Sequence, residues 1–280
     1  MIKDTIKKQI RRTGMVKELE MENKKLEIQV NNLKKEKLKV ASDKLRKKYK
    51  NLVPDKLDLI DVTFQKIIPN AQSFADLGGV WGVNGGYTFY TLDKYNIKSS
   101  FLVDADITDP VVSKANEYEN LTLINDKFGE DRVIEQLGAL DVIFLFDVLL
   151  HQVKPDWDEI LDKYSSICKC IVIYNQQFTN SENTIRLFDL GHDEYFENVP
   201  HDKDDPTYIS LFENMYEIHP DYQPERIWRD ILDVWQWGIV DKDLYVKLKD
   251  LGFNLEFYQN LGNFGDLKNF ENHVFIFKKK

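Results

Sequence analysis

The sequence predicts an α/β fold in which a mostly parallel sheet is covered by helices on both faces. A long helix precedes this sheet in the chain. Short apolar runs alternate with helical patterns between residues 72 and 174. The first of these runs ends in an acid that is followed at once by glycines, in the segment 76–82. Near the N-terminus, apolar residues recur every seven positions. Strand and helix alternation is typical of parallel sheets, and a seven-residue apolar period is typical of coiled coils.

The first 50 residues contain no proline and carry 17 Lys and Arg against 7 Asp and Glu, although the whole chain has a net charge of −9. Their heptad positions hold Leu19, Leu26, Leu33 and Val40. We expect residues 1–50 to form a basic coiled coil that joins copies of the chain into a homo-oligomer. Contact with an anionic membrane surface or with nucleic acid is a less favoured alternative, because the segment has no Trp or Phe to anchor it.

The later elements follow from apolar period and turn signals. A helical pattern begins after Pro54 and reaches residue 68. The predicted strands of the alternating region are 72–77, 99–104, 120–125, 139–146 and 168–174, and the predicted helices are 85–95, 109–118, 129–138 and 155–166. An amphipathic helix near Leu244 stops at Gly252, and strands at 254–260 and 272–278 follow. Ligands bind at the carboxyl ends of parallel strands, so the polar residues at those ends are the candidates for chemistry.

The first strand end combines an acid with a glycine loop. Asp76 stands near the end of the apolar run, and Gly78, Gly79 and Gly82 follow it. Glycines let the backbone turn sharply and approach a ligand closely. A carboxylate here would repel the pyrophosphate of a dinucleotide, and the spacing departs from the dinucleotide fingerprint. The loop therefore favours a cationic or zwitterionic ligand.

The next strand ends also carry acids. Asp104 ends the second strand, where a carboxylate can accept two hydrogen bonds from a ribose diol. Asp126 follows the third strand, and Asp147 follows the fourth, with His151 four residues later.

In this order the strand ends resemble those of class I S-adenosylmethionine-dependent methyltransferases, and the final helix and strand pair resembles the end of their sheet. The resemblance implies a seven-stranded, mostly parallel Rossmann-like sheet and an enzyme that uses S-adenosylmethionine. Val80 stands where the family's motif I has its middle glycine. The implied cofactor-binding residues are Asp76, Gly78, Gly79 and Gly82 at the methionine part, Asp104 at the ribose and Asp126 near the adenine amine.

The resemblance also implies where the reaction would occur. Histidine has a suitable intrinsic pKa for a base, so His151 is the candidate that removes a proton from the methyl acceptor. Asp147 would orient His151 or contact the substrate, and the end of the fifth strand would line the acceptor site with Tyr174, Asn175 and Gln176. Asp147 and Asn175 supply only a partial set of oxygen ligands, so no metal is expected.

The domain spanning residues 51–280 contains an acidic, aromatic insertion at about 179–240. From Gln176 to Val240 there are 14 Asp and Glu against 4 Lys and Arg. Aromatic faces beside carboxylates suit a polyhydroxylated or cationic substrate, whereas this charge would repel nucleic acid. For most of the aromatic residues, packing within a small core of the insertion is the favoured interpretation.

We expect O-methylation of a sugar or glycan precursor. The alternatives are methylation of another small metabolite, or a coiled-coil scaffold with a degenerate methyltransferase fold. The chain has no apolar run that could span a bilayer and no signal peptide, which predicts a cytoplasmic protein. Cys168 and Cys170 are expected to be buried thiols rather than metal ligands.

Overall fold

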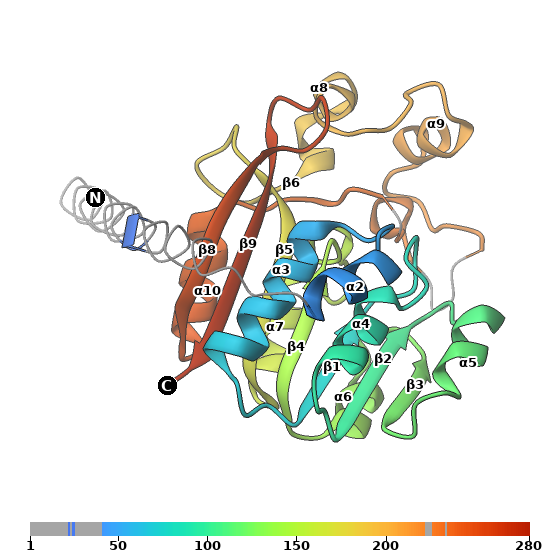
Figure 1. The fold of residues 1–280 in the computed structure, drawn as a ribbon. Helices are drawn as coiled ribbons and strands as arrows, with labels where there is room; N and C mark the ends of the chain where they lie inside the picture. The colour runs from blue at the N-terminus through green and yellow to red at the C-terminus, as the bar shows by residue number, and fades with distance from the viewer. Residues whose placement is uncertain (1–21, 23, 26–40, 222–225, 233) are drawn as a thin grey trace.

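A seven-stranded sheet forms the centre of the protein in the computed structural model, which describes residues 22, 24–25, 41–221, 226–232 and 234–280 (Figure 1). The strand order is β3-β2-β1-β4-β5-β9-β8. The first five strands are mutually parallel, and β9 is antiparallel to both of its neighbours. This confirms the predicted sheet. The strands are β1 (Ser73–Leu77), β2 (Ser99–Asp104), β3 (Leu121–Asn125), β4 (Leu140–Phe146), β5 (Cys168–Phe178), β8 (Phe253–Asn263) and β9 (Phe270–Lys279).

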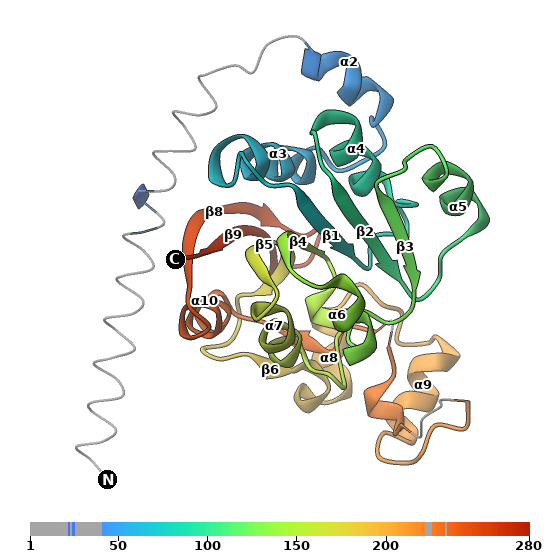
Figure 2. The same cartoon turned by 90° about the horizontal axis from the view of Figure 1, so that it is seen from below.

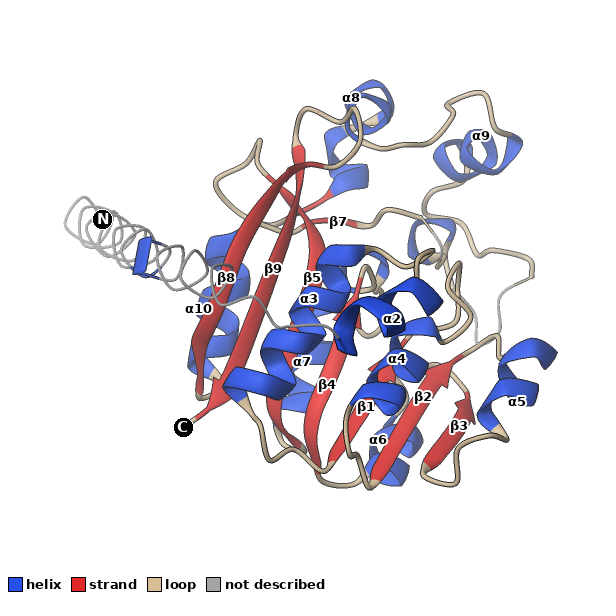
Figure 3. Ribbon diagram, viewed as in Figure 1, coloured by secondary structure: helices blue, strands red, loops and turns tan. Residues whose placement is uncertain are grey.

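Helices lie on both faces of the sheet, as the view from below shows (Figure 2). One face carries α3 (Pro54–Val62), continued by η1 (Thr63–Ile67), with α4 (Gly86–Lys94) and α5 (Asp109–Ala115). The other face carries α6 (Asp131–Leu137), α7 (Trp157–Ser165) and α10 (Asp241–Asp250). Each face has its own buried apolar cluster, because the strands are apolar on both sides, as expected of a covered parallel sheet. Figure 3 shows the strands in red between the two layers of helices.

The segment before α3 packs on this domain. Helix α2 (Ala41–Lys48) contributes Leu45 to the cluster on the α3 face, although the predicted boundary placed α2 with the N-terminal segment. Its Arg46 donates to the buried carboxylate of Asp61 in α3 at 2.7 Å. The same carboxylate accepts from Lys94 at 2.7 Å and from Tyr90 at 2.9 Å, both in α4. Asp61 therefore links three helices.

Most of the predicted coiled coil, residues 1–21, 23 and 26–40, lies outside the described residues. Within the described ranges, every helix is too short or too polar to cross a membrane. Cys168 and Cys170 are both buried free thiols, as predicted.

The insertion forms a layer beyond the carboxyl ends of β4 and β5, at the top of Figure 1. It contains η3 (Leu187–Leu190), α8 (His192–Asn198), α9 (Pro206–Glu213) and η4 (Trp228–Asp230). A two-stranded antiparallel sheet joins β6 (Ile185–Arg186) to β7 (Trp237–Gly238). Its own apolar core includes Tyr195, Tyr208 and Trp235. These three aromatic residues therefore stabilise the insertion, as the favoured interpretation expected, whereas Tyr216 is 70% exposed.

Candidate functional site

The glycine loop begins directly after β1 and is fixed by its neighbours. The backbone N–H of Gly78 donates to the carbonyl of Val103 in β2 at 2.7 Å. Asp76 is 1% exposed, and its carboxylate accepts from the Thr88 hydroxyl at 2.7 Å. A Cβ atom at Gly79 would lie 2.5 Å from the carboxyl carbon of Asp76, closer than real Cβ atoms come. The backbone at Gly79 is therefore folded over the buried acid.

The pKa of Asp76 is raised to about 6, mainly by burial and to a smaller extent by the nearby carboxylate of Asp104. The hydrogen bond from Thr88 and the ammonium of Lys56 oppose this rise. The site thus holds a carboxylate that is ionised at neutral pH although it is enclosed by protein.

Val80, where the family motif has glycine, fits the loop without disturbing it. Its side chain is 3% exposed and belongs to an apolar cluster with Phe89 and Leu102. Its backbone N–H donates to the Asp104 carboxylate at 2.9 Å. The substitution therefore places an apolar side chain in the core and leaves the backbone to hold the loop against β2.

Asp104 and Asp126 lie side by side at the ends of β2 and β3, since the backbone N–H of Asp126 donates to the Asp104 carbonyl at 3.0 Å. The second carboxylate oxygen of Asp104 accepts from the backbone N–H of Asp106 at 3.1 Å. Asp126 forms a two-point contact with Arg132, at 2.6 Å from Nε and 2.7 Å from Nη2, which lowers the pKa of Asp126. The structure thus brings both predicted acids together, with Asp126 already held by a guanidinium.

Asp147 has a positive φ of 58° directly after β4, and its partners differ from those expected. One carboxylate oxygen accepts from the ammonium of Lys56 in α3. The other accepts from the side-chain amide of Gln176 at 2.8 Å. These two contacts fix the Asp147 carboxylate, and neither of them involves His151, so the orientation of His151 by Asp147 stays a prediction.

Lys56 is a component of the site that the sequence reasoning missed. The residue is 5% exposed, and its ammonium lies 4.7 Å from the ring centroid of Tyr174, 5.3 Å from Tyr87 and 5.8 Å from Phe146. A cation among aromatic faces beside a carboxylate is compensated by both kinds of group. A signal was available: Lys56 precedes Ile60 and Phe64 by four and eight residues, which puts it in the apolar stripe of the helix.

The three predicted acceptor residues do not share one face of β5. Tyr174 packs with the apolar cluster under α3 and α4, and Gln176 reaches Asp147 from the same side. Successive residues of a strand point to opposite faces, so Asn175 points to the α10 face, in register with His273 of β9. Tyr174 and Gln176 therefore lie on the same side as Asp147, whereas Asn175 lies on the opposite face of the strand, and the acceptor role of all three stays a prediction.

His151 ends the short helix η2 (Leu149–His151), where the insertion covers the end of β4. Its Nδ1 lies 2.9 Å from the carbonyl oxygen of Val234 in the insertion. A carbonyl can only accept, so this contact places a proton on Nδ1 and the lone pair of the neutral ring on Nε2. The insertion thus fixes the tautomer of the predicted base.

Together, the strand ends present three carboxylates, those of Asp76, Asp104 and Asp147, and one ammonium, that of Lys56. This arrangement has an excess of negative charge at the carboxyl edge of the sheet. Such an edge suits a ligand with cationic groups and hydroxyl donors, and it disfavours a polyphosphate.

No family model matches the sequence, and no curated protein matches it. The structure is similar to solved methyltransferases. The N-terminal domain of EvdMO1 with SAH bound has a TM-score of 0.50 and 13% identity, over 80% of each chain. An N1-methyltransferase of 1,6-didemethyltoxoflavin from Burkholderia thailandensis has a TM-score of 0.49 and 10% identity, over 80% of this chain and 77% of that one.

An O-methyltransferase family protein from Burkholderia thailandensis has a TM-score of 0.46 and 14% identity, over 80% of this chain. The match spans only 56% of the length of that protein. What the likeness to the EvdMO1 domain shows is a shared α/β fold.

Proposed function

We propose that this protein is an S-adenosylmethionine-dependent methyltransferase. The observation that carries the proposal is the set of carboxylates at the ends of β1, β2 and β4, arranged around a glycine loop that folds over Asp76. A sulfonium cofactor is cationic at its reactive centre, and its ribose offers two hydroxyl donors. An excess of carboxylates is complementary to both features.

The residues present fit this cofactor. Each carboxylate oxygen of Asp104 accepts one backbone N–H, from Val80 or from Asp106, and keeps a second acceptor position for a ribose hydroxyl. The loop over Asp76, with Gly78, Gly79 and Gly82, would hold the methionine part, and Asp126 would lie toward the adenine amine. The EvdMO1 domain, which has this fold, was crystallised with SAH.

The bound cofactor supplies an electrophilic methyl group, and the protein must position the acceptor and take its proton. His151 is the base of this proposal, because an imidazole has a suitable intrinsic pKa and the contact of its Nδ1 with the Val234 carbonyl holds the ring in place. Asp147 is fixed by Lys56 and Gln176, so its role is to hold the edge of the acceptor site.

For the acceptor we propose a hydroxyl of a sugar or glycan precursor. Carboxylate and amide groups at the ends of β4 and β5, namely Asp147 and Gln176, can pair with hydroxyls. The aromatic ring of Tyr174 lies beside them. The alternative of a non-catalytic scaffold rests on Val80; the burial of that side chain and its backbone bond to Asp104 support the catalytic proposal, because the loop accommodates valine.

Calorimetric titration with S-adenosylmethionine and its demethylated product tests the cofactor proposal. We expect binding of the full chain in the micromolar range, and at least about tenfold weaker binding by Asp104→Asn, which loses a charge-assisted acceptor. Asp106→Asn is the matched control, because this exposed neighbour contributes a backbone N–H that the substitution retains. The absence of binding at millimolar ligand would refute the proposal.

Methyl transfer from labelled cofactor to a panel of free sugars and sugar nucleotides tests the acceptor and the base. With an accepted substrate, His151→Gln should lower turnover by about 10²-fold or more, because proton removal is lost. His192→Gln, at an exposed position of α8, should leave turnover unchanged. Near-normal turnover of His151→Gln would exclude His151 as the base.

A further inference from the structure

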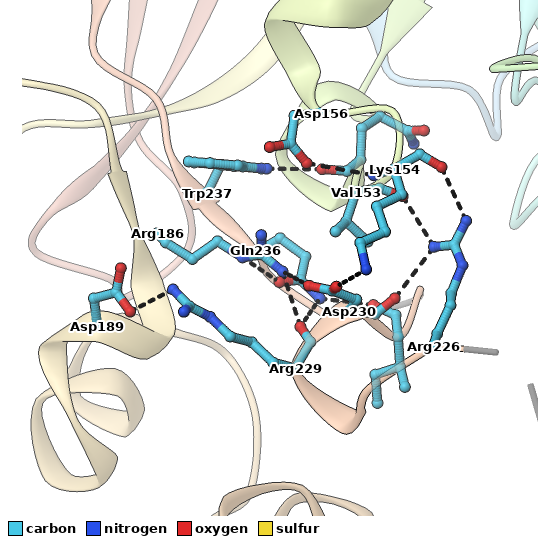
Figure 4. A network of polar contacts seen from close by, with 12 residues as sticks. Val153, Lys154, Asp156, Arg186, Asp189, Arg226, Arg229, Asp230, Gln236 and Trp237 are labelled. Carbon is cyan, nitrogen blue, oxygen red and sulfur yellow. Dashed lines mark hydrogen bonds and ion pairs between the residues drawn. The ribbon is translucent and has the colours of Figure 1, made fainter. Parts of the chain in front are cut away.

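An open pocket with a volume of about 570 Å³ lies in the insertion, between the small β6/β7 sheet and η4. This volume is within the range of small-molecule sites. The pocket is lined by two guanidinium groups, a tryptophan, a threonine and two carboxylates: Arg186, Arg229, Trp237, Thr184, Asp189 and Asp230. Figure 4 shows the polar network around it. The proposed methyltransferase site makes no use of these residues.

Positive charge gathers around this pocket, although the insertion as a whole is acidic. Four cationic side chains contribute to the network, those of Lys154, Arg186, Arg226 and Arg229 (Figure 4). Asp230 pairs with Lys154 at 2.6 Å and with Arg186 at 2.9 Å, and Asp189 pairs with Arg229.

Arg226 is 8% exposed and donates to backbone carbonyls, of Val153 at 2.9 Å, Lys154 at 2.9 Å and Asp230 at 3.2 Å. A third carboxylate, that of Asp156, lies close enough to act on Arg186 while it caps α7. Lys154 is 59% exposed, so water solvates its ammonium, whereas the guanidinium of Arg226 is buried and, in the described part of the chain, contacts backbone carbonyls.

The two arginines that line the pocket have N–H groups that are not used in the hydrogen bonds of the network. Arg186 uses Nε on the side-chain oxygen of Gln236 at 2.8 Å, and Nη2 on the Arg229 carbonyl and on Asp230, both at 2.9 Å. Its guanidinium carbon lies 5.1 Å from the ring centroid of Trp237, which fixes the guanidinium in place. Among the described residues, Nη1 of Arg186 takes part in none of these bonds. Nε of Arg229 also has no hydrogen-bond partner, but protein encloses it, so Arg229 would bind a ligand through the other end of its guanidinium.

We propose that this pocket, the oxyanion pocket, binds a carboxylate or phosphate group of a small molecule, with Arg186 and Arg229 as its donors. A guanidinium presents its N–H groups in a fork that matches the oxygens of both groups. A bound anion would give these two guanidinium groups a further charge-assisted partner. This site is separate from the proposed methyl transfer, and its test does not depend on that function.

Titration calorimetry of the full chain with inorganic phosphate, and separately with acetate, tests the oxyanion pocket. Potassium chloride of equal ionic strength serves as the blank. We expect saturable one-site binding in the millimolar range. Tighter binding of phosphate assigns the natural group as a phosphate, and tighter binding of acetate assigns it as a carboxylate.

Two variants at one ion pair separate binding from folding. Arg229→Gln should weaken anion binding at least about tenfold, since a charge-assisted donor is lost. Asp189→Asn breaks the same Asp189–Arg229 contact but keeps the guanidinium, so the affinity should stay equal or increase. Arg186→Lys keeps the charge but loses the fork, and should also weaken binding.

Two results would overturn the proposal. One is a response to phosphate and acetate that does not exceed that of chloride. The other is an equal loss in Asp189→Asn and Arg229→Gln at unchanged thermal midpoints, because the ion pair, and not the guanidinium donor, would then account for the effect.

Discussion

The ion pair between Lys56 and Asp147 should respond asymmetrically to the loss of either partner. The side chain of Lys56 is 6% exposed, and that of Asp147 is 38% exposed. Lys56→Met removes the ammonium, fills its place with an apolar chain of similar length, and leaves a carboxylate that water and Gln176 can solvate. Asp147→Asn leaves the ammonium buried among three aromatic rings without a carboxylate.

The magnitudes follow from these two environments. Lys56→Met loses one charge-assisted bond and the attraction to the rings, but it also ends the burial of a charge, so about 1–2 kcal/mol of unfolding free energy should be lost. Asp147→Asn should cost about 3 kcal/mol, the range for a buried charge that loses its partner. Asparagine tolerates the positive φ of this position, so backbone strain adds little.

Urea unfolding followed by circular dichroism measures these differences. The double variant should be more stable than Asp147→Asn alone, with a coupling energy of about 1–3 kcal/mol. Lys169→Met is the control, because Lys169 is 68% exposed in its pair with Asp141 and should cost less than about 1 kcal/mol. A Lys56→Met variant that is less stable than Asp147→Asn, or a coupling energy near zero, would refute this reasoning.

Two further predictions concern the loop after β1. The folded-state pKa of Asp76, about 6, lies above the ordinary value of 3.8 for an aspartate side chain. Its contribution to stability is therefore complete at pH 4 or below and is lost as the pH rises through 6. The free energy of unfolding of the wild type, relative to Asp76→Asn, should fall by about 2–3 kcal/mol from pH 4 to pH 7 in urea titrations, and a pH-independent difference would contradict this. Gly79→Ala, which forces a Cβ against the Asp76 carboxylate, should cost about 1–3 kcal/mol and weaken cofactor binding in calorimetry. A Cβ at Gly82 would meet open space, so Gly82→Ala carries only the cost of the positive φ, roughly 1 kcal/mol. A larger loss of unfolding free energy in Gly82→Ala than in Gly79→Ala would show that the contact between the new Cβ and Asp76 is not the cause.

The sheet was predictable because each of its strands can be recognised from an apolar run in the local sequence. The second strand begins at residue 99 and ends at Asp104, as predicted, because an apolar run gives way to an acid at the edge of the core. The glycine loop and the order of acids along the chain were equally visible. These features depend on neighbouring residues in the sequence.

The predictions are wrong where contacts between residues far apart in the sequence determine the structure. Strand β5 continues to Phe178 instead of ending at residue 174, although Asn175, Gln176 and Gln177 are polar. Pairing with β9, as in Gln177 opposite Glu271, extends the strand through these amides. An apolar period contains no information about a partner strand about a hundred residues away, so the predicted strand stopped early and the alternation of Tyr174, Asn175 and Gln176 between its two faces was not foreseen.

The partners of Asp147 illustrate the same limit. Lys56 precedes Asp147 by 91 residues and belongs to a helix that reads as an ordinary amphipathic one. A lysine next to acids in a helix normally faces water. The spacing of Lys56 to Ile60 and Phe64 indicates a buried position, but only the crossing of α3 over the end of β4 shows which carboxylate the ammonium contacts.

The carboxylate of Asp61 has a mechanical consequence. It holds Arg46 of α2 and both Tyr90 and Lys94 of α4. Helix α4 begins at Gly86, where the glycine loop ends. One buried carboxylate thus ties α2 to the helix that follows the glycine loop, so a substitution of Asp61 would release both helices at once.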